Sequence, residues 1–433
     1  MNVCLANDSF PPLYDGVANT VINYARIIQE RYGNAAVAVP RYPNVTDDYP
    51  FEVVRYGSID TTRLVGYRAG VPFTAHGMRR LAEFMPDVIH CHCPVASAVL
   101  CRQLRENTGA PMILTYHTKF DIDIHRAIES KLFRETAIKF ILDNIKSADE
   151  VWVVNRGAGE NLRSLGYDGD YRIMLNGVEF ENAPAPAEEQ RAVSDEFALA
   201  DGIPVLLFVG RMIRYKGIWI ILDGLKKLMD SGVDFRMLFV GDGDDLAEAK
   251  EYARSLGISG KTVFAGAVRD RKKLRAIYSR ADLFLLPSVF DNNPIVVKEA
   301  AACSTASVLI RGSSSAEGVT DGVNAVLISE SADELASALK RLADNPELFS
   351  KLGHAASRDL YLSWEDSVAG AVARYSDVIR AYRAGETQRM PAHLDNAIEA
   401  VSEVFRALEK LRQPLSDRSD KTLNQRINAA SLR

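Results

Sequence analysis

Two short stretches of the chain carry residues that could bind a diphosphate and a sugar. Residues 204–217 (PVLLFVGRMIRYKG) form an apolar run followed by Gly210, Arg211 and, five residues later, Lys216. The run predicts a buried strand, and Lys216-Gly217 begins the helix that follows. Helix dipoles disfavour a cation at a helix N-terminus unless an anion joins it. Two cations beside a helix N-terminus at a strand end therefore favour a diphosphate.

The second stretch, residues 287–301 (PSVFDNNPIVVKEAA), carries two carboxylates around the start of a helix. Asp291 lies in the predicted loop, and Glu299 lies eight residues later along the helix. A carboxylate can accept hydrogen bonds from two vicinal hydroxyls, which ribose and hexose rings offer. Each charge alone would be explained as a solvated surface residue. Together with the cations, they indicate an enzyme that handles a nucleotide sugar.

Residues around position 294 predict how this second helix begins. Asn293 is expected to be the N-cap, and Pro294 the first helical residue, where a missing N–H costs nothing. The next free amides, which could donate to an anion or a hydroxyl, belong to Ile295 and Val296.

The elements that must position these residues are short apolar strands that alternate with longer helical patterns. Strands that are apolar on both faces and separated by helices indicate parallel sheets covered on both sides. The fold class is therefore predicted to be α/β, with two doubly wound Rossmann-like domains. The predicted strands are 3–7, 36–39, 87–90, 112–116, 151–154 and 172–175, then 205–210, 236–241, 262–266, 283–287, 307–310 and 325–328.

A Pro-, Ala- and acid-rich segment divides the two series of strands. We predict four parts: an N-terminal domain, residues 1–180, completed by a returning helix at about 363–383; a linker, 181–203; a C-terminal domain, 204–362; and a helical tail, 384–433. Ligands of open α/β sheets bind outside the carboxyl ends of the strands. The central cleft between the two domains is therefore the expected site.

Composition excludes several classes of function. The chain has 433 residues, 25% of them charged, and a formal net charge of −5, without the basic excess of a nucleic-acid binder. No apolar run approaches the length of a membrane-spanning helix, and the N-terminus predicts a strand instead of a signal peptide. The chain is therefore expected to be cytoplasmic. Five cysteines, an odd number, argue against a disulfide framework.

Three segments resemble metal or dinucleotide motifs only superficially. Residues 90–93 (HCHC) lie in a predicted strand, whose alternation sends the two histidines to one face and the two cysteines to the other. Asp121-Ile-Asp123 has the Asp-x-Asp form that can hold a metal-bound diphosphate, but such triplets are common by chance. Residues 241–245 (GDGDD) lack the third glycine of a dinucleotide fingerprint. Neither a metal site nor NAD binding is predicted.

Several ordered motifs together resemble the retaining glycosyltransferases of family 4, which have the GT-B fold. The family pattern is a strand, GR, a loop and KG, followed later by PS-x-x-E-x-F-G-x-x-x-x-E-A. Asp291 stands at the first family Glu and Glu299 at the second. The resemblance covers most of residues 1–383. Its other landmarks are FPPLYDGVANTVINYAR, DVIHCHCP, LTYHT, VVNRGAGENL and GSSSAEGVTDGVNAVLI.

The resemblance implies a role for each matching residue of the C-terminal domain. Arg211, which follows Gly210, and Lys216 would hold the diphosphate of the donor. Asp291 would contact the hydroxyls of the transferred sugar, and Glu299 the ribose diol. Gly241 would leave room near the nucleotide. One departure is that Asn292-Asn293-Pro294 replaces a segment with Phe-Gly, and Pro294 cannot donate the amide that glycine would.

In the N-terminal domain, the resemblance points to Gly16 and His117. Gly16 would let the backbone approach the donor phosphate or the acceptor, although its family partner glycine is Asp15 here. His117 would face the transferred sugar. A histidine at a strand end is more often structural, and its place in this series of motifs is what favours function.

The implied reaction moves a sugar from a nucleoside diphosphate sugar to an acceptor hydroxyl, with retention and without a metal or cofactor. The donor would bind mainly to the C-terminal domain, and a sugar, lipid or small-molecule acceptor mainly to the N-terminal one. Two alternatives stay open. One is a nucleotide-sugar epimerase or hydrolase on the same scaffold, and the other is a non-catalytic carbohydrate-binding subunit.

Two helical patterns leave partner interactions open. Residues 391–413 carry one apolar stripe, which predicts either a helix packed on its own subunit or a short coiled coil that joins subunits in a homo-oligomer. Residues 131–146 (KLFRETAIKFILDNIK) are basic and amphipathic, which is typical of peripheral membrane contact at the inner face of the membrane and equally of an ordinary core helix.

Overall fold

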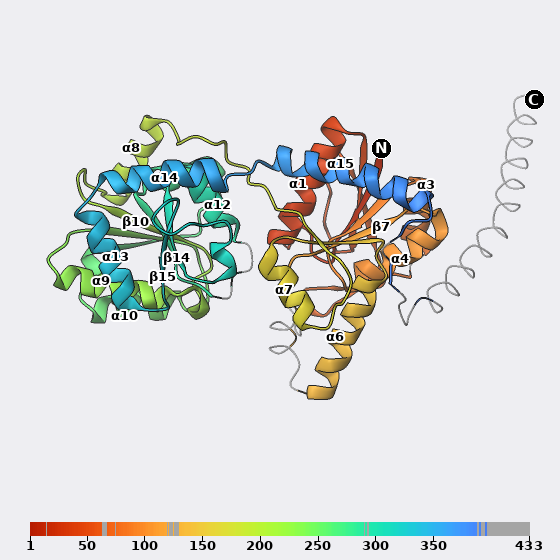
Figure 1. The fold of residues 1–433 in the computed structure, drawn as a ribbon, viewed down its shortest axis with the longest axis horizontal. Coiled ribbons are helices and arrows are strands. Elements are labelled where there is room, and N and C mark those ends of the chain that lie inside the picture. The colour runs from red at the N-terminus through yellow and green to blue at the C-terminus, as the bar shows by residue number, and fades with distance from the viewer. Residues whose placement is uncertain are drawn as a thin grey trace, which may run out of the picture. The chain divides into compact units, whose positions relative to one another are not determined.

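The chain folds into two compact units. The computed structural model describes residues 1–433 except 14, 63–66, 74, 119, 121–123, 125–129, 290, 292–293, 388, 391–394 and 396–433. The N-terminal unit comprises the described residues of 1–153, 162–172 and 371–395, and the C-terminal unit comprises those of 154–161 and 173–370. Each unit has one large sheet between layers of helices (Figure 1).

The N-terminal unit has a seven-stranded sheet in the order β3-β2-β1-β6-β7-β8-β9. The strand pairs from β3 through β8 are all parallel, and β1, β6 and β7 are buried along almost their whole length. The order reverses between β1 and β6, which makes the carboxyl ends of these strands the topological switch point. The strands are β1 (Asn2–Ala6), β2 (Asn34–Pro40), β3 (Glu52–Tyr56), β6 (Val88–Cys91), β7 (Met112–Tyr116), β8 (Glu150–Val153) and β9 (Arg172–Ile173).

Helices cover both faces of this sheet. On one face, Tyr24 of α1 and Tyr375 of α15 both contact the ring of His90 in β6. On the other, α4 packs on β6 and β7, and Arg102 of α4 pairs with Asp143 of α6 at 2.9 Å. The helices are α1 (Gly16–Arg31), α3 (Ala75–Glu83), α4 (Ala96–Thr108), α6 (Lys131–Lys146), and parts of α7 (Arg156–Ser164) and α15 (Trp364–Arg383); β4 (Ser58–Ile59) and β5 (Ala69–Gly70) form a small antiparallel sheet.

The C-terminal unit repeats this architecture with six strands in the order β12-β11-β10-β13-β14-β15, and its switch point lies between β10 and β13. All its strand pairs are parallel, and β10, β13 and β14 are buried at every residue. The strands are β10 (Val205–Val209), β11 (Arg236–Val240), β12 (Thr262–Gly266), β13 (Leu283–Leu286), β14 (Ala306–Ile310) and β15 (Val326–Ile328).

Two groups of helices flank the second sheet (Figure 1). One group contains α9 (Ile218–Asp230), α10 (Leu246–Ser255) and α13 (Ala332–Ala343). The other contains α8 (Ala187–Phe197), α11 (Arg271–Arg280), α12 (Ile295–Ala302) and α14 (Glu347–Leu360). The described part of the unit also contains three short 3₁₀ turns: η1 (Arg214–Lys216), η2 (Ser259–Lys261) and η3 (Ser314–Ala316).

The two doubly wound parallel sheets confirm the predicted α/β fold class. Each predicted strand coincides with an observed one, and no end differs by more than two residues. The predicted strands do not include β3, because the sequence EVVRY interrupts its apolar residues with Glu52 and Arg55. The segment 181–203, predicted as a linker, contains α8, whose Val193 is buried in the core of the C-terminal unit. Burying an apolar face against α11 gives this acid-rich segment its helix.

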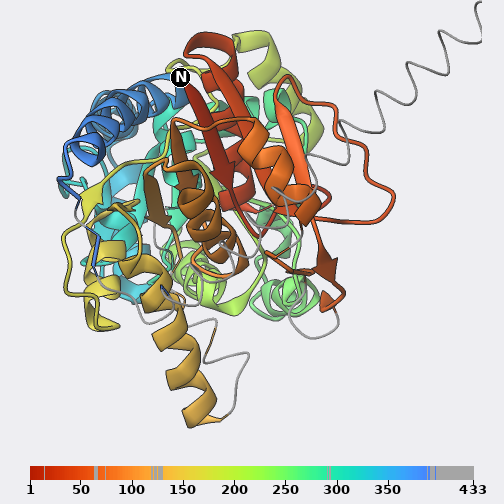
Figure 2. The same ribbon diagram turned by 90° about the vertical axis from the view of Figure 1, so that its right-hand side faces the viewer.

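Three further expectations concern helices. Apart from Asp395, the predicted helix 391–413 lies outside the described residues, and so does the rest of the tail from residue 396. In α6, Ile141 and Ile145 are buried, while Leu132 and Phe133 at its other end are 70% and 66% exposed. That exposed end extends away from the rest of its unit (Figures 1 and 2). Among the described residues, no helix combines the length and the apolar character needed to cross a membrane.

Candidate active site

Lys216 and Asp291 meet at the switch point of the C-terminal sheet. Lys216 follows β10 and Asp291 follows β13; because these strands are neighbours, their carboxyl ends bring the two residues together. The Nζ of Lys216 pairs with Oδ1 of Asp291, and the two side chains are only 15% and 13% exposed. The other oxygen of Asp291, Oδ2, is buried and has no hydrogen-bond partner within the described part of the chain. An oxygen in that state is ready to accept from a ligand hydroxyl.

Arg211 lies beside this pair with its guanidinium exposed. It follows Gly210 at the end of β10, and its Nη2 donates to the hydroxyl of Tyr215 at 3.0 Å. The Nζ of Lys216 lies 5.6 Å from the centre of the same tyrosine ring. The ring of Tyr215 thus lies close to both predicted diphosphate ligands.

Two glycines allow the backbone to pack tightly around this strand end. Gly217 has a φ of 79°, and a Cβ added there would lie 2.0 Å from the carbonyl oxygen of Pro287. Gly241 has a φ of 143°, and a Cβ there would lie 1.8 Å from the carbonyl oxygen of Gly210. Any larger residue would push the turns apart, so these glycines let η1 and the loop after β11 lie close to the strand ends.

The helix that follows Asp291 begins one residue later than predicted. Pro294 has an extended ψ of 114°, so it is the N-cap instead of the first helical residue, and α12 begins at Ile295. Asn293, the predicted N-cap, lies outside the described residues. The amides of Ile295 and Val296 lie in the first turn of α12, where helix amides have no intrahelical carbonyl to donate to.

Glu299 lies in a buried network inside the C-terminal unit. Its side chain is 3% exposed; Oε1 accepts from Nη2 of Arg271 at 2.6 Å, and Oε2 accepts from the hydroxyl of Tyr278 at 3.1 Å. Burial, and next the charge of Glu299, raise the pKa of Tyr278 well above its usual value. Both oxygens of Glu299 already have a protein partner, so the predicted contact with a ribose diol would use their remaining lone pairs. That contact stays a prediction.

In the N-terminal unit, three histidines gather along β6 and β7. His117 follows β7, and its Nε2 lies 2.9 Å from Nδ1 of His92, which follows β6. The rings of His92 and His90 lie 4.0 Å apart, on the same face of the sheet as the alternation predicts. His90 itself is held by Tyr375 and Thr115 at 2.6 and 2.7 Å.

All three histidines are held in the neutral form. Burial lowers the pKa of His117 to about 3 and moves the pKa values of His90 and His92 well below their usual range. Since neutral imidazole has one donor and one acceptor nitrogen, one of the bonded pair His92 and His117 donates to the other. The buried Nε2 of His92 has no partner among the described residues. An unpaired lone pair costs less than an unpaired N–H, so Nε2 of His92 is the unprotonated nitrogen. The proton of His92 is then on Nδ1, which donates to Nε2 of His117. His117 therefore carries its own proton on Nδ1.

We expect this cluster to make the free energy of unfolding fall in mild acid. A histidine with a lowered folded pKa binds more protons when unfolded, so its contribution is complete above pH 6.5 and is lost as the pH falls. Each ring contributes at most about 1.4 kcal/mol per pH unit. We therefore expect the free energy of unfolding to fall by up to about 4 kcal/mol per unit below pH 6.5. The raised pKa of buried Asp8 offsets part of that slope.

Urea unfolding at pH 7.5, 6.5 and 5.5 measures this slope. Replacing His92 by leucine removes one of the three rings, so the slope of that variant should be about one third smaller. A free energy of unfolding that stays constant from pH 7.5 to 5.5 would contradict the neutral cluster.

The loop after β1 differs from its predicted role in one respect. Gly16 begins α1, and the space where its side chain would lie is open. However, the carboxylate of Asp15 caps the helix and accepts from the amides of Val17 and Ala18 at 2.9 and 2.7 Å. The negative charge of Asp15 and its use of these amides disfavour a phosphate at this helix N-terminus.

Comparison with known proteins decides the family. A family profile described as "Glycosyltransferase Family 4" matches residues 14–182, and one described as "Glycosyl transferases group 1" matches residues 189–359. The two matches together take in most of both units. The chain belongs to glycosyltransferase family 4. The predicted family and the predicted enzyme class, a glycosyltransferase, are therefore confirmed.

The following relatives of this family 4 glycosyltransferase are distant in sequence. The alpha-monoglucosyldiacylglycerol synthase of Streptococcus pneumoniae is 23% identical, over 70% of each chain. The sulfoquinovosyl transferase SQD2 of Arabidopsis thaliana is 25% identical, over 66% of this chain and 54% of that one. In fold, the solved structure of HepE from Anabaena in complex with UDP-glucose matches with a TM-score of 0.69, at 16% identity, over 88% of this chain and 100% of that chain.

Three residues near the predicted site of this family 4 glycosyltransferase have no motif that predicts their contacts. His92 has only the pattern of a strand, and the contacts of Tyr215 and Arg271 depend on tertiary neighbours. Asp121 and Asp123 lie outside the described residues. Within the described part of the chain, His, Cys, Asp and Glu side chains form no group of three suited to a metal ion.

Proposed function

We propose that this family 4 glycosyltransferase moves a sugar from a nucleoside diphosphate sugar to an acceptor hydroxyl, with retention of the anomeric configuration and without a metal ion. The arrangement of Lys216, Asp291 and Arg211 at the switch point between β10 and β13 carries this proposal. Open α/β sheets bind nucleotides at that point.

The two cations are suited to neutralise the leaving group. A unit charge about 4 Å from a phosphate oxygen is worth on the order of 4 kcal/mol at the effective dielectric constant of a protein site. Lys216 and Arg211 together could therefore supply much of what a metal ion supplies to a departing diphosphate. Before the donor binds, the charge of Lys216 is balanced by Asp291.

The proposed step forms a bond between the acceptor oxygen and the anomeric carbon, and it breaks the bond between that carbon and the phosphate oxygen. The proton of the acceptor hydroxyl passes to the departing phosphate oxygen, and the nucleoside diphosphate leaves. Attack from the face of the departing phosphate keeps the anomeric configuration and needs no protein nucleophile. We infer this front-face route from the family and from the absence of an obvious nucleophile in the matched motifs.

Other residues would hold the sugar and the nucleoside. Asp291 would accept from hydroxyls of the sugar through Oδ2, and the amides of Ile295 and Val296 would donate to the sugar or a phosphate. His117 would contribute a neutral hydrogen bond to the transferred sugar from the N-terminal unit. Glu299 would bind the ribose diol. In the same proposal, Gly210 and Gly241 leave room for the nucleotide. Gly16 leaves room for the acceptor, because Asp15 disfavours a phosphate at this helix N-terminus.

The relatives suggest classes of donor and acceptor. HepE was solved with UDP-glucose, and the pneumococcal relative is named for a glucosylated diacylglycerol. We therefore propose a nucleoside diphosphate hexose as donor and a sugar, lipid or small-molecule hydroxyl compound as acceptor. The exposed Leu132 and Phe133 on the basic end of α6 suit peripheral contact with an anionic membrane, and both this contact and a homo-oligomer stay predictions.

The anomeric configuration of the first product tests the mechanism. Water can replace the acceptor, so we expect slow hydrolysis of the correct UDP-, GDP- or ADP-sugar to release the free α-sugar from an α-linked donor, together with the nucleoside diphosphate. Proton NMR can follow the anomeric signal before mutarotation mixes the two forms. The rate should be unchanged in excess EDTA.

Three results would contradict the proposal. Release of the β-sugar would indicate inversion, and a rate lost in EDTA and restored by Mg²⁺ would indicate a metal-dependent reaction. Conversion of the donor into another nucleotide sugar, without release of the diphosphate, would indicate an epimerase.

A further inference from the structure

The N-terminal unit contains a polar cavity at the carboxyl ends of β2 and β3. Its volume is about 800 Å³, which lies within the range of small-molecule sites. Twelve residues line it, from the segment after β2, from β3, from the β4–β5 region and from α3. Three of these are arginines, Arg41, Arg55 and Arg68, whereas Asp47 is the one acid among the twelve. The lining therefore favours an anion.

The arginines differ in how they are engaged. Arg55 is neutralised by a bidentate pair with Asp47, with N–O distances of 2.8 and 2.7 Å. Arg68 donates through Nε to the carbonyl oxygen of Arg41 at 3.1 Å and to Ser58 at 3.0 Å, and it pairs with the exposed Asp60 at 3.3 Å. These bonds fix the wall of the cavity, because they connect the β4–β5 region to the segment after β2.

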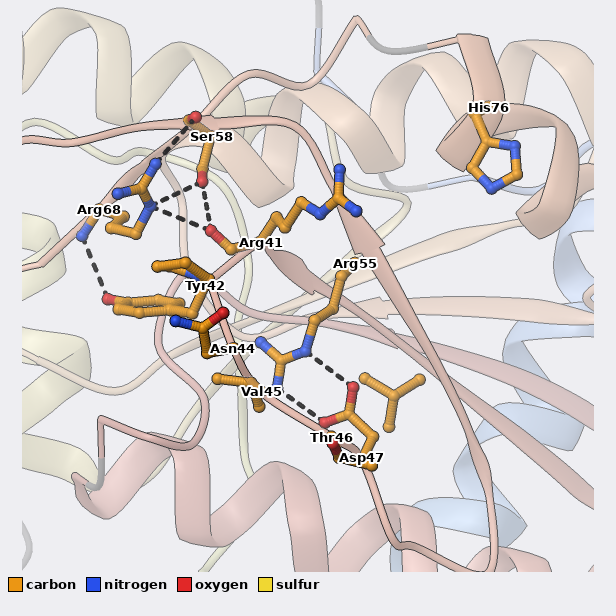
Figure 3. A pocket seen from close by; sticks show the side chains of 12 residues that line it. Arg41, Tyr42, Asn44, Val45, Thr46, Asp47, Arg55, Ser58, Arg68 and His76 are labelled. Carbon is orange, nitrogen blue, oxygen red and sulfur yellow. Dashed lines mark hydrogen bonds and ion pairs between the residues drawn. The ribbon is translucent and has the colours of Figure 1, made fainter.

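Arg41 is the cation that the fold leaves available. Its backbone is held by Tyr56, Arg68 and Ser58, whereas its exposed guanidinium pairs with no carboxylate in the described part of the chain. Figure 3 shows this guanidinium extending between Arg55 and His76, apart from the Arg68–Ser58 group. A guanidinium placed this way can form two parallel hydrogen bonds to a phosphate.

The rest of the lining suits a hydroxylated ligand. The hydroxyl of Tyr42 accepts from the amide of Arg68 at 3.1 Å and keeps its own proton for another acceptor. Thr46 and Asn44 add a hydroxyl and an amide. By contrast, Asp15 occupies the amides at the N-terminus of α1, which disfavours an anion there. Of these two places in the unit, the cavity is therefore the one that favours an anion.

We infer that this cavity binds the phosphate group of the acceptor, a phosphate ester of a sugar or polyol, either free or as a lipid headgroup. This inference rests on the proposed transfer to an acceptor hydroxyl. Strands lie about 4.8 Å apart, so the cavity at β2 and β3 is about 10 Å from the switch point between β1 and β6. The acceptor therefore carries its reactive hydroxyl roughly one sugar ring away from its phosphate.

Binding to the full chain tests the inference, with inorganic phosphate, glucose 6-phosphate and glucose as probes in titration calorimetry. We expect the two phosphates to bind and glucose not to bind. Arg41→Gln should lower the affinity for glucose 6-phosphate at least tenfold, because it removes a charge-assisted hydrogen bond. Arg41→Lys should restore part of the affinity. The matched control Arg31→Gln, an exposed arginine at the end of α1, should leave it unchanged.

Two further arms separate this site from the donor site and identify the source of the phosphate. Lys216→Gln should retain glucose 6-phosphate binding, and Arg41→Gln should retain donor hydrolysis, so either proposal can fail alone. Vesicles containing phosphatidylglycerol replace the free probe in the second arm, with phosphatidylcholine vesicles as control. If Arg41→Gln binds either phosphate source more weakly than the unmodified protein does, the proposed phosphate site in the cavity is supported. Equal binding by Arg41→Gln and the unmodified protein, or no binding to any phosphate probe, overturns it.

Discussion

Replacing Lys216 by glutamine is expected to lower kcat/KM for the donor about a thousandfold. The reason is the loss of one cation from the departing diphosphate, worth on the order of 4 kcal/mol at about 4 Å. The buried carboxylate of Asp291 would also lose its ion partner and would then repel the diphosphate. Steady-state rates of nucleoside diphosphate release, with each donor at a range of concentrations, measure the effect.

Lys226→Gln is a matched control for this variant. Lys226 lies on α9, the helix that follows η1. Like Lys216, it pairs with an aspartate, but its partner Asp230 lies on the surface of the same helix. It should change kcat/KM by less than twofold, because an exposed i,i+4 ion pair is worth only about 0.3–0.5 kcal/mol. Lys216→Arg should keep part of the activity. Near-normal activity in correctly folded Lys216→Gln would show that this residue does not serve the leaving group.

The second large effect is expected at His117, whose replacement by alanine should lower kcat about a hundredfold. His117 follows β7, and a hydrogen bond with His92 fixes its neutral ring. The ring therefore presents a hydrogen-bonding nitrogen in a fixed position. Removing one such preorganised group typically costs a factor of about 100 to 1,000 in kcat. Because the folded pKa of His117 is about 3, the loss should be the same at pH 6 and pH 8. Single-turnover rates at both pH values test this.

His117→Gln and His354→Ala complete the experiment at this position. Glutamine can still donate a hydrogen bond, so it should recover part of the lost rate. His354 is an exposed histidine of α14, and its removal should leave kcat unchanged. A His117→Ala variant with unchanged kcat, or with a loss confined to stability, would assign the residue a structural role.

The fold could be predicted from the sequence to a large extent, because buried parallel strands are continuous apolar runs. VLLFV and LFLL, for example, are buried at every residue. β3 could not be found in this way, since its Glu52 and Arg55 lie at partly exposed positions near the edge of the sheet. The helix in the predicted linker also depends on a tertiary contact, the packing of α8 on α11.

The candidate site was predictable only where adjacent strands determine it. Arg211, Lys216 and Asp291 follow β10 and β13, and the strand order of a doubly wound sheet makes these ends neighbours. Side-chain partners were not predictable in the same way. Neither the bonds from Arg271 and Tyr278 to Glu299 nor the engagement of Asp15 at the α1 N-terminus follows from spacing alone, because each depends on rotamers and packing.

The most direct test of the cationic site is a thermal-shift measurement with UDP-, GDP- and ADP-sugars on the unmodified protein and on an Arg211→Gln/Lys216→Gln double variant. A ligand that binds the folded state raises the melting temperature by mass action. We predict that one donor class raises the melting temperature of the unmodified protein and that the double variant loses this shift. The absence of a shift with every donor, or an equal shift in the double variant, would contradict the proposed diphosphate site.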